Sequence, residues 1–425
     1  MNGGEAAGTG AVIDPLCHPV TDALGDLLAT VRRIDPAGEL ADYIPELARV
    51  DANGFGIAAT ATSGHSYAAG DADRLFTIQS VSKPFVYALA LEALGREAVL
   101  ERVGVEPSGE PFNAISFDQI GRPANPMINA GAIVATSLIP AADAEERFAV
   151  IRAGLSAFAG RPLDLAHDVY ESESATGDRN RGLAHLARAS GMLGSTVADA
   201  VEPYFQQCSL LVDTGDLAMM AATLANGGEH PLTGERVVAE AVARDVLSVM
   251  ASCGMYDRSG DWMFRVGMPA KSGVGGGIVA VTPGQYGIGV YSPPLDSAGN
   301  SSRGVAALQL LSAEFGLHML DRPRESVSAV ESIRTDAATG AITVEVRGEI
   351  DFVAAEQIVY AAMEAVGGDG SGTHTGTETA ALVIDLGSAT RATPVAARLM
   401  RAMAGDAGTR GYRISVRDPA GILVP

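Results

Sequence analysis

A serine and a lysine stand three residues apart in the stretch FTIQSVSKPFVYALALEALG, which runs from Phe76 to Gly95. From Ser80 onward, apolar residues recur at positions i+1, i+5, i+8 and i+9, a spacing that predicts a helix ending near Gly95. Pro84 fits best in the first turn of this helix, where a missing N–H is least costly. The pattern therefore places Ser80 at a helix N-terminus, with Lys83 on the same face.

This arrangement suits a serine nucleophile. The backbone N–H groups and the positive dipole end of a helix favour a developing alkoxide or oxyanion at Ser80. A neutral Lys83 amine could accept the serine proton and so activate a weak nucleophile for attack on a carbonyl. The spacing S-x-x-K also occurs by chance, however, so the two residues taken alone could be ordinary residues at the start of a helix.

The use of lysine strengthens the catalytic interpretation. Of the 30 Lys and Arg residues, only Lys83 and Lys271 are lysines. Arginine keeps its proton in proteins, whereas a buried lysine amine can become neutral and act as a base. Lys271 opens the segment KSGVGGGIVAV, and S-x-x-K followed downstream by K-[ST]-G is the paired signature of penicillin-recognising serine enzymes. The alternative for this segment is the edge of a Gly-rich hairpin.

Resemblance to the penicillin-recognising enzymes also assigns roles to the residues that begin at Lys271. It implies that the K-[ST]-G strand lines the active site and that the residue after its glycine supplies an oxyanion N–H. Lys271, Ser272 and Gly273 would then support the site, and Val274 would be the backbone donor. The glycines that follow would let substrate approach the backbone closely.

Further motifs resemble the serine-dependent glutaminase family, in consistent order, over about residues 20–320. The resemblance implies an α/β (α+β) fold like that of β-lactamases and penicillin-binding proteins, with an antiparallel sheet and a helical subdomain, for residues 16–322. The motifs are ADYIPELA (41–48), QSVSKP (79–84), EPSGEPFN (106–113), GRPANPMINAGAI (121–133), SESATGDRN (172–180), YFQQCS (204–209), MAATLANGGEHPLTGERV (220–237), SCGMYD (252–257) and PAKSGVGGG (269–277).

The resemblance implies hydrolysis of L-glutamine to L-glutamate and ammonia through a serine acyl-enzyme, with no cofactor and no metal. Ser80 matches the family's nucleophile and Lys83 its general base. Tyr43 and Tyr256 match active-site tyrosines, and the Tyr256 hydroxyl could relay a proton to the leaving ammonia. The residues that match substrate-binding positions are Tyr43, Ser80, Asn129, Glu173, Asn180, Tyr204, Tyr256 and Val274.

Polar residues of these types suit glutamine, whose α-ammonium and α-carboxylate are costly to bury without partners. Glu173 can pair with the ammonium, while asparagine and tyrosine side chains can donate to the carboxylate or grip the amide. Glu171 could compete with Glu173, although the spacing to Asn180 favours Glu173. Taken singly, Tyr43 could simply pack, Asn129 could cap a helix and Asn180 could lie in a turn.

Nearby charged residues and thiols have structural explanations. Asp178, Arg179 and Arg181 are expected to form ion pairs that support the fold. Cys208 and Cys253 lie within the motifs, but we expect them to pack as small buried residues and not to act as nucleophiles.

Composition excludes several classes of function. A net charge of −21 and a pI near 4.7 disfavour nucleic acid, which requires basic patches. No apolar run approaches the roughly 20 residues of a membrane helix. Three widely spaced cysteines and seven scattered histidines predict neither a disulfide framework nor a metal site. Residues 1–15 lack signal-peptide features and are expected to form a flexible tail, so we expect a cytoplasmic protein.

The pattern changes near residues 320–332, where proline and charges follow a helical segment. Beyond this break the sequence predicts a strand at 341–350, a helix at 352–366, a strand at 381–386, a helix at 394–408 and a strand at 412–418. Residues 328–425 resemble a STAS domain. The family's D-S-[ST]-G phosphoacceptor stretch appears here as TPVA (393–396), which has no acceptor serine. A protein or small-ligand partner and a purely oligomerising role both remain open.

Three alternatives accompany the glutaminase prediction: an asparaginase-like enzyme, a β-lactamase-like enzyme, and a STAS-type regulatory protein whose larger domain is inactive. The intact Ser80, Lys83, Tyr256 and Lys271 argue against the last of these. We also expect a homodimer or a homotetramer.

Overall fold

The structure is a computed structural model that describes residues 18–109, 115–321, 328–367, 381–406 and 413–423. The chain divides into two compact units, one of Leu24–Arg322 and one of Met1–Ala23 with Pro323–Pro425. The tail expected at residues 1–15 and nearly all of the Gly/Thr-rich loop at 367–380 lie outside the described residues. Within the described ranges, no helix has the length and apolar character needed to cross a membrane.

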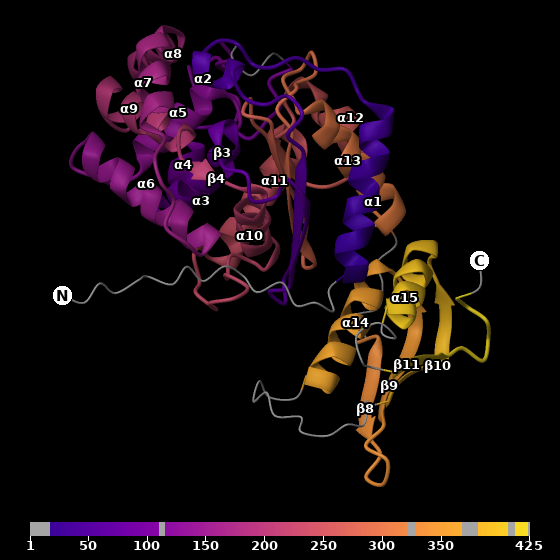
Figure 1. The fold of residues 1–425 in the computed structure, drawn as a ribbon. Helices are drawn as coiled ribbons and strands as arrows, with labels where there is room; N and C mark the ends of the chain where they lie inside the picture. The colour runs from indigo at the N-terminus through magenta and orange to yellow at the C-terminus, as the bar shows by residue number, and fades with distance from the viewer. Residues whose placement is uncertain (1–17, 110–114, 322–327, 368–380, 407–412, 424–425) are drawn as a thin grey trace, which may run out of the picture. The chain divides into compact units, whose positions relative to one another are not determined.

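Most helices lie before residue 320 (Figure 1). They are α1 (His18–Ile34), α2 (Pro45–Ala48), the short 3-10 helix η2 (Gln79–Ser82), α3 (Lys83–Leu94), α4 (Arg96–Leu100), α5 (Asn129–Leu138), α6 (Ala144–Ala159), α7 (His167–Thr176), α8 (Asp178–Ala189), α9 (Val197–Cys208), α10 (Thr214–Ala225), α11 (Glu240–Cys253), the 3-10 turn η3 (Tyr256–Arg258), α12 (Ser259–Arg265) and α13 (Ser302–Phe315).

The larger unit is built on a five-stranded antiparallel sheet in the order β2-β1-β7-β6-β5. A separate pair of short strands, β3 and β4, lies outside it. The strands are β1 (Gly56–Ala61), β2 (Ser66–Gly70), β3 (Phe76–Thr77), β4 (Leu211–Val212), β5 (Ala270–Ser272), β6 (Gly277–Thr282) and β7 (Tyr286–Tyr291). The predicted combination of an antiparallel sheet with a helical region is confirmed for this unit.

Helices cover both faces of this sheet, which explains why β1, β6 and β7 are buried along their whole length. On one face, α10 approaches β7 so closely that a Cβ at Gly287 or Gly289 would lie 2.0 or 2.3 Å from the helix backbone. On the other face, α13 packs against Ile278 of β6. The alternating glycines of β7 therefore follow from the close helix–sheet contact.

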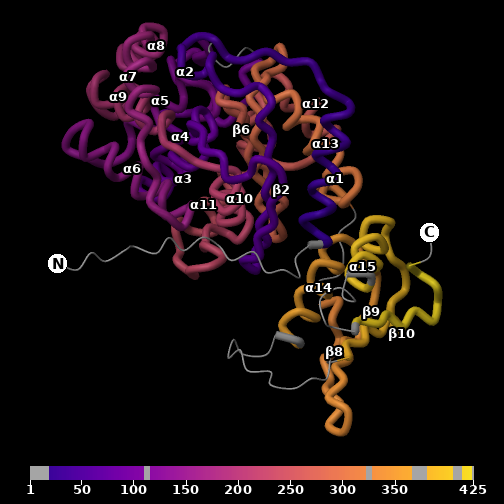
Figure 2. The backbone as a smooth tube through the Cα atoms, viewed as in Figure 1, coloured from indigo at the N-terminus to yellow at the C-terminus, as the bar shows by residue number. Residues whose placement is uncertain are grey.

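The remaining helices form the helical region beside the sheet, around one apolar core that includes residues of α3, α5, α6, α8, α9, α10 and α11. Figure 2 shows α3 and α11 close together, and these two helices are in contact although they lie in distant parts of the chain. The turn η2 contacts β5 and β6 on the sheet side and α9 on the helical side. The predicted nucleophile therefore lies where the helical region meets the sheet.

The smaller unit contains β8 (Val330–Thr335), β9 (Ile342–Ile350), α14 (Phe352–Gly367), β10 (Ala381–Ala392), α15 (Pro394–Asp406) and β11 (Arg413–Arg417). Its four-stranded sheet has the order β11-β10-β9-β8, in which β10 is parallel to both neighbours and β8 is antiparallel to β9. The expected strand and helix order is confirmed. Strand β8 is an addition, because its residues overlap the composition break and carry no clear alternating pattern.

Candidate active site

The predicted turn forms as expected, with one refinement. Ser80 lies in the 3-10 helix η2, which continues directly into α3 at Lys83, and Pro84 occupies the first turn of α3. Both Ser80 and Lys83 are buried. Gln79 has a φ of +49°, a left-handed conformation that glutamine rarely adopts and that costs free energy. The Ser82 hydroxyl donates to the Gln79 carbonyl at 2.8 Å and so stabilises this strained turn.

Ser80 faces the turn η3, which carries Tyr256. The two side chains share a hydrogen bond. Because the Tyr256 hydroxyl donates its own proton to the Ser272 carbonyl at 3.0 Å, Ser80 is the donor to Tyr256. The Lys271 amine lies 3.9 Å from the centre of the Tyr256 ring and donates to the Ser272 carbonyl at 2.5 Å. The two predicted motifs thus meet through Tyr256.

Lysine 83 belongs to a second hydrogen-bonded group. Its Nζ donates to Asn129 Oδ1 at 2.6 Å and to the Met127 carbonyl at 3.4 Å, and within the described residues it donates to no oxygen of Ser80. Asn129 in turn donates from Nδ2 to Asn180 Oδ1 at 3.0 Å. Burial lowers the pKa of the Lys83 amine to about 8, so a neutral amine is accessible near neutral pH.

A third group surrounds Glu173 on α7. Tyr43 donates to Glu173 Oε1 at 2.7 Å, and Gln79 also hydrogen-bonds this carboxylate. Burial raises the pKa of Glu173, while the bonds from Tyr43 and Gln79 oppose that rise. Desolvation of the hydroxyl also raises the pKa of the Tyr43 phenol, although the residue as a whole is 46% exposed, and the neighbouring Glu173 charge adds to the effect. Of the two carboxylates weighed in the sequence, Glu173 is buried within this group and Glu171 is exposed.

Tyr204 is buried on α9, close enough to Glu173 and Tyr256 to interact with both electrostatically. It also hydrogen-bonds Cys208, one helical turn later. Burial raises the pKa of the Cys208 thiol to about 12, which disfavours the thiolate, and the expected buried position of Cys208 is confirmed. Cys208 also hydrogen-bonds Ser82 below the nucleophile turn.

The glycine-rich segment after Lys271 lies against the nucleophile turn. A Cβ at Gly273 would stand 3.1 Å from the Ile78 carbonyl oxygen, and one at Gly275 would stand 2.7 Å from the Thr77 carbonyl oxygen. These glycines therefore let the strand segment approach the backbone before the nucleophile turn closely, while the predicted approach of substrate stays a prediction. The side chain of Val274, between them, packs against a small apolar cluster of Ile44, Leu47 and Val169.

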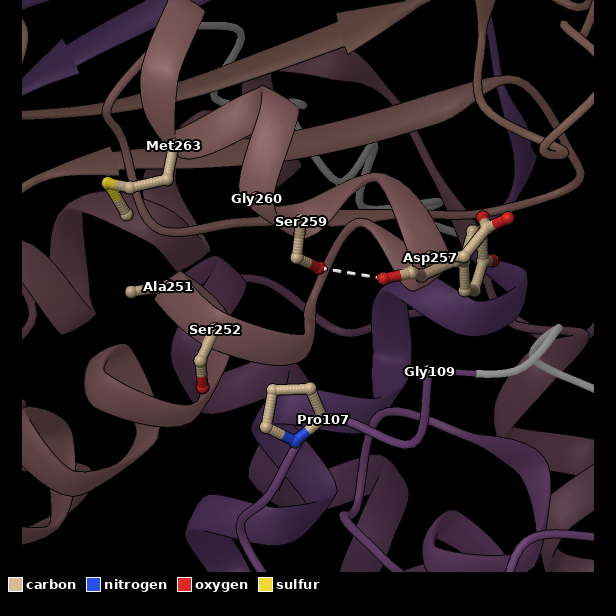
Figure 3. Close-up of a pocket in the computed structure, with 9 residues that line it drawn as sticks. Pro107, Gly109, Ala251, Ser252, Asp257, Ser259, Gly260 and Met263 are labelled. Carbon is tan, nitrogen blue, oxygen red and sulfur yellow. Dashed lines mark hydrogen bonds between the residues drawn. The ribbon is translucent and has the colours of Figure 1, made fainter.

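A pocket of about 540 Å³ lies beside the Tyr256 turn (Figure 3). At this turn, Ser259 donates to the Tyr256 carbonyl at 2.9 Å and fixes its position. Tyr256 is the only predicted site residue among those that line this pocket in the described part of the chain. The lining consists of Pro107, Gly109, Ala251, Ser252, Tyr256, Asp257, Ser259, Gly260 and Met263. Across the described ranges, no group of three or more His, Cys, Asp or Glu side chains could hold a metal ion.

The chain matches the family described as Glutaminase over residues 38–320. It is 43% identical over 410 residues to the Glutaminase of Corynebacterium glutamicum, an alignment that covers 96% of each chain. The chain belongs to the glutaminase family. It is a glutaminase, an amidohydrolase.

Two further comparisons agree with membership of the glutaminase family. This glutaminase is 53% identical over 290 residues to Glutaminase 2 of Bradyrhizobium diazoefficiens, an alignment that covers 68% of this chain and 46% of that relative, or less than half of its length. It superposes on the crystal structure of a protein called Mglu in its glutamate form with a TM-score of 0.69 and 40% identity, covering 95% of this chain and 99% of that one.

The geometry of this glutaminase also contains residues to which the sequence analysis gave no role. Gln79 stands beside Ser80 in the motif QSVSKP, but its contacts with Tyr43 and Glu173 depend on the left-handed backbone, which no local pattern signals. Ser82 bonds the Gln79 carbonyl within the same turn, and it also hydrogen-bonds Cys208 of α9, a contact that no local pattern signals.

Proposed function

We propose that this glutaminase hydrolyses the side-chain amide of L-glutamine to L-glutamate and ammonia by two acyl-transfer steps. Ser80 Oγ bonds to the amide carbon, and its proton passes to a base. The amide nitrogen of the tetrahedral intermediate takes up a proton as the C–N bond breaks, so that ammonia leaves and a γ-glutamyl ester remains on Ser80. Water then cleaves this ester and releases glutamate. The backbone N–H groups of Ser80 and Val274 are proposed to stabilise the oxyanion.

Lys83 is the proposed general base. Burial lowers its pKa to about 8, which permits a neutral amine, whereas burial raises the pKa of Tyr256 and disfavours a tyrosinate. Tyr256 instead holds the Ser80 hydroxyl and is placed to pass a proton to the leaving ammonia. The Lys83 amine must turn from Asn129 toward Ser80 once substrate is bound, and catalytic hydrogen bonds often tighten only at that stage.

The other polar groups are proposed to recognise the amino-acid part of glutamine. The buried Glu173 carboxylate would pair with the α-ammonium, with Tyr43 also contacting the substrate. Asn129, Asn180 and Tyr204 would donate to the α-carboxylate or the side-chain amide. The observation that carries the proposal is the contact of Ser80 with Tyr256 beside the desolvated Lys83.

Ammonia release from glutamine tests the serine mechanism. Ser80→Ala and Lys83→Arg should each abolish it, because the first removes the nucleophile and the second installs a group that keeps its proton. Ser248→Ala is the matched control, since this serine lies on the exposed part of α11 and its hydroxyl donates to the Arg244 carbonyl one turn earlier. Near-normal turnover by Ser80→Ala would contradict the proposal.

Substrate class is tested by assaying glutamine, asparagine and a penicillin in parallel. We expect turnover of glutamine, because a hydrogen-bonding pocket discriminates strongly against analogues that leave its polar groups unpaired. Comparable turnover of asparagine would favour the asparaginase-like alternative. Stable labelling by a fluorescent penicillin would favour the β-lactamase-like alternative and the fold likeness on which it rests.

We further propose that residues 328–425 form a STAS-like domain. The parallel order of β9, β10 and β11 with the two intervening helices supports this, while TPVA at 393–396 offers no acceptor serine. A cytoplasmic homodimer or homotetramer is proposed with it. Deleting the residues after Asp321 and comparing activity and oligomer size separates a regulatory role from an assembling one.

A further inference from the structure

A group of polar side chains joins α7, α8 and α9 on the side of these helices that does not carry the proposed substrate contacts. Glu202 on α9 accepts from Tyr170 at 3.0 Å and from Ser174 at 3.1 Å, and both donors lie on α7. It also accepts from Arg181 on α8 at 3.0 Å. One carboxylate thus receives donors from two other helices.

Arg181 connects the same helices through its full guanidinium. Nη1 donates to the Ser174 carbonyl at 2.6 Å, and Nη2 donates to the Ser174 hydroxyl at 3.0 Å as well as to Glu202. The guanidinium also stacks over the Phe205 ring of α9, 5.3 Å from its centre. Only arginine offers planar donors for two helices together with a stacking face.

The ring of Phe205 packs against the turn between α7 and α8. A Cβ at Gly177, the residue between these helices, would lie 2.1 Å from the tip of the Phe205 ring. The ring is fully buried, so α9 packs directly against this turn. Arg181, stacked on the outer side of the ring, holds it there.

Each residue of this group is close in sequence to a proposed substrate-binding residue. Ser174 follows Glu173, Arg181 follows Asn180, and Phe205 follows Tyr204. Consecutive residues on a helix point about 100° apart, so one member of each pair can face the substrate while the other binds the neighbouring helices. The spacing of Glu173, Asn180 and Tyr204 therefore depends on the contacts that hold α7, α8 and α9 together.

We propose that Arg181 and Glu202 are positioning residues that set the spacing of Glu173, Asn180 and Tyr204, and with it the affinity for the α-amino acid part of the substrate. This inference rests on the proposed roles of those three residues. Ser80, Lys83 and Tyr256 lie on other elements, so the chemical step does not depend on the group in the same way.

The test uses the full chain with Arg181→Lys, Glu202→Gln and the double variant, and measures KM and kcat for glutamine and the Kd for glutamate. KM and Kd should rise roughly tenfold in each single variant, with kcat within about threefold of wild type, as expected for lost uniform binding. In the double variant, the rise in KM and Kd should be much smaller than the product of the rises in the two single variants, because both substitutions remove the same interaction.

Arg96→Lys is the matched control. Arg96 pairs with Asp245 at 2.5 Å between α4 and α11, at comparable exposure but away from the proposed substrate contacts. It should lower the melting temperature without changing KM. If Arg181→Lys does not fold, Tyr170→Phe and Ser174→Ala, which each remove one hydroxyl, should still raise KM by about twofold to threefold.

Glu173→Gln separates the two hypotheses. If it leaves the Kd for glutamate unchanged, the proposed substrate role is wrong. If it weakens glutamate binding while folded Arg181→Lys and Glu202→Gln keep the wild-type KM, or lose kcat alone, the positioning role is wrong and the recognition proposal stands.

Discussion

The amine of Lys83 donates to Asn129 Oδ1 at 2.6 Å, while the hydroxyl of Ser80 bonds Tyr256. The neutral amide of Asn129 satisfies the buried amine without adding a negative charge. This choice matters because a carboxylate at the same place would favour the charged ammonium. With an amide at this place, the lowering of the Lys83 pKa by burial is not offset by a neighbouring carboxylate.

Asn129→Asp tests this relationship directly. If Lys83 is the base, kcat for wild type should rise with pH and level off above about 8, as the amine loses its proton. Replacing the amide by a carboxylate of the same shape should move that midpoint upward by about 1 pH unit or more. The measurement is the pH dependence of kcat at saturating glutamine, and an unshifted midpoint would argue against Lys83 as the titrating base.

Lys83→Met should stabilise the fold while abolishing activity. Below about pH 8 both the folded and unfolded states carry the lysine proton, so the folded state bears the cost of a buried charge. Between about 8 and 10.5 the folded state loses its proton first, and stability rises with pH. The variant should therefore gain up to about 3 kcal/mol of unfolding free energy at neutral pH, and less in alkali. Urea unfolding at both pH values measures this difference.

Tyr256→Phe should lower kcat by roughly 100-fold or more with little change in KM. The substitution keeps the ring beneath the Lys271 amine but removes the hydroxyl that holds Ser80 and is proposed to protonate ammonia. Steady-state ammonia release gives both constants. A KM effect without a kcat effect would assign Tyr256 to substrate binding alone.

Gly275→Ala should be more damaging than Gly273→Ala. The new methyl at Gly275 would lie 2.7 Å from the Thr77 carbonyl oxygen and push the strand segment from the nucleophile turn, at a cost of about 1–3 kcal/mol. At Gly273 the closest atom is 3.1 Å away and a small shift suffices. Gly25→Ala, in the open interior of α1, is the control and should be neutral or stabilising. Thermal unfolding and kcat should show the same order.

Local patterns were sufficient for the helix at Ser80 and Lys83, because apolar periodicity and proline position are fixed by the chain itself. The same holds for the strands and helices after residue 340, where the periods of two and 3.6 are clear. Joint motif order pointed to residues that the structure places in hydrogen-bonded groups, such as Lys83 with Asn129 and Tyr43 with Glu173, while their substrate roles stay a prediction. The sequence could not show which side chains hydrogen-bond to one another across the fold. The partner of Lys83 is Asn129 on α5, from a distant part of the chain.

The sequence also did not predict the backbone conformation at two positions of the site. Gln79 and Tyr256 both adopt positive φ, at +49° and +58°, although neither residue type favours it. The Ser82 hydroxyl donates to the Gln79 carbonyl and the Ser259 hydroxyl donates to the Tyr256 carbonyl, so a local hydrogen bond stabilises each turn. Strain of this kind at the two turns that meet at the nucleophile is typical of functional sites.

The proposed serine mechanism requires a covalent intermediate at Ser80. Rapid mixing of the full chain with glutamine, followed by acid quenching and intact mass measurement, should reveal a species heavier by one γ-glutamyl group. Peptide mapping should place that group on Ser80, and Ser80→Ala should show no such species. A γ-glutamyl group on any other residue, or glutamate formation with direct incorporation of water and no trapped adduct at any quench time, would contradict the serine mechanism.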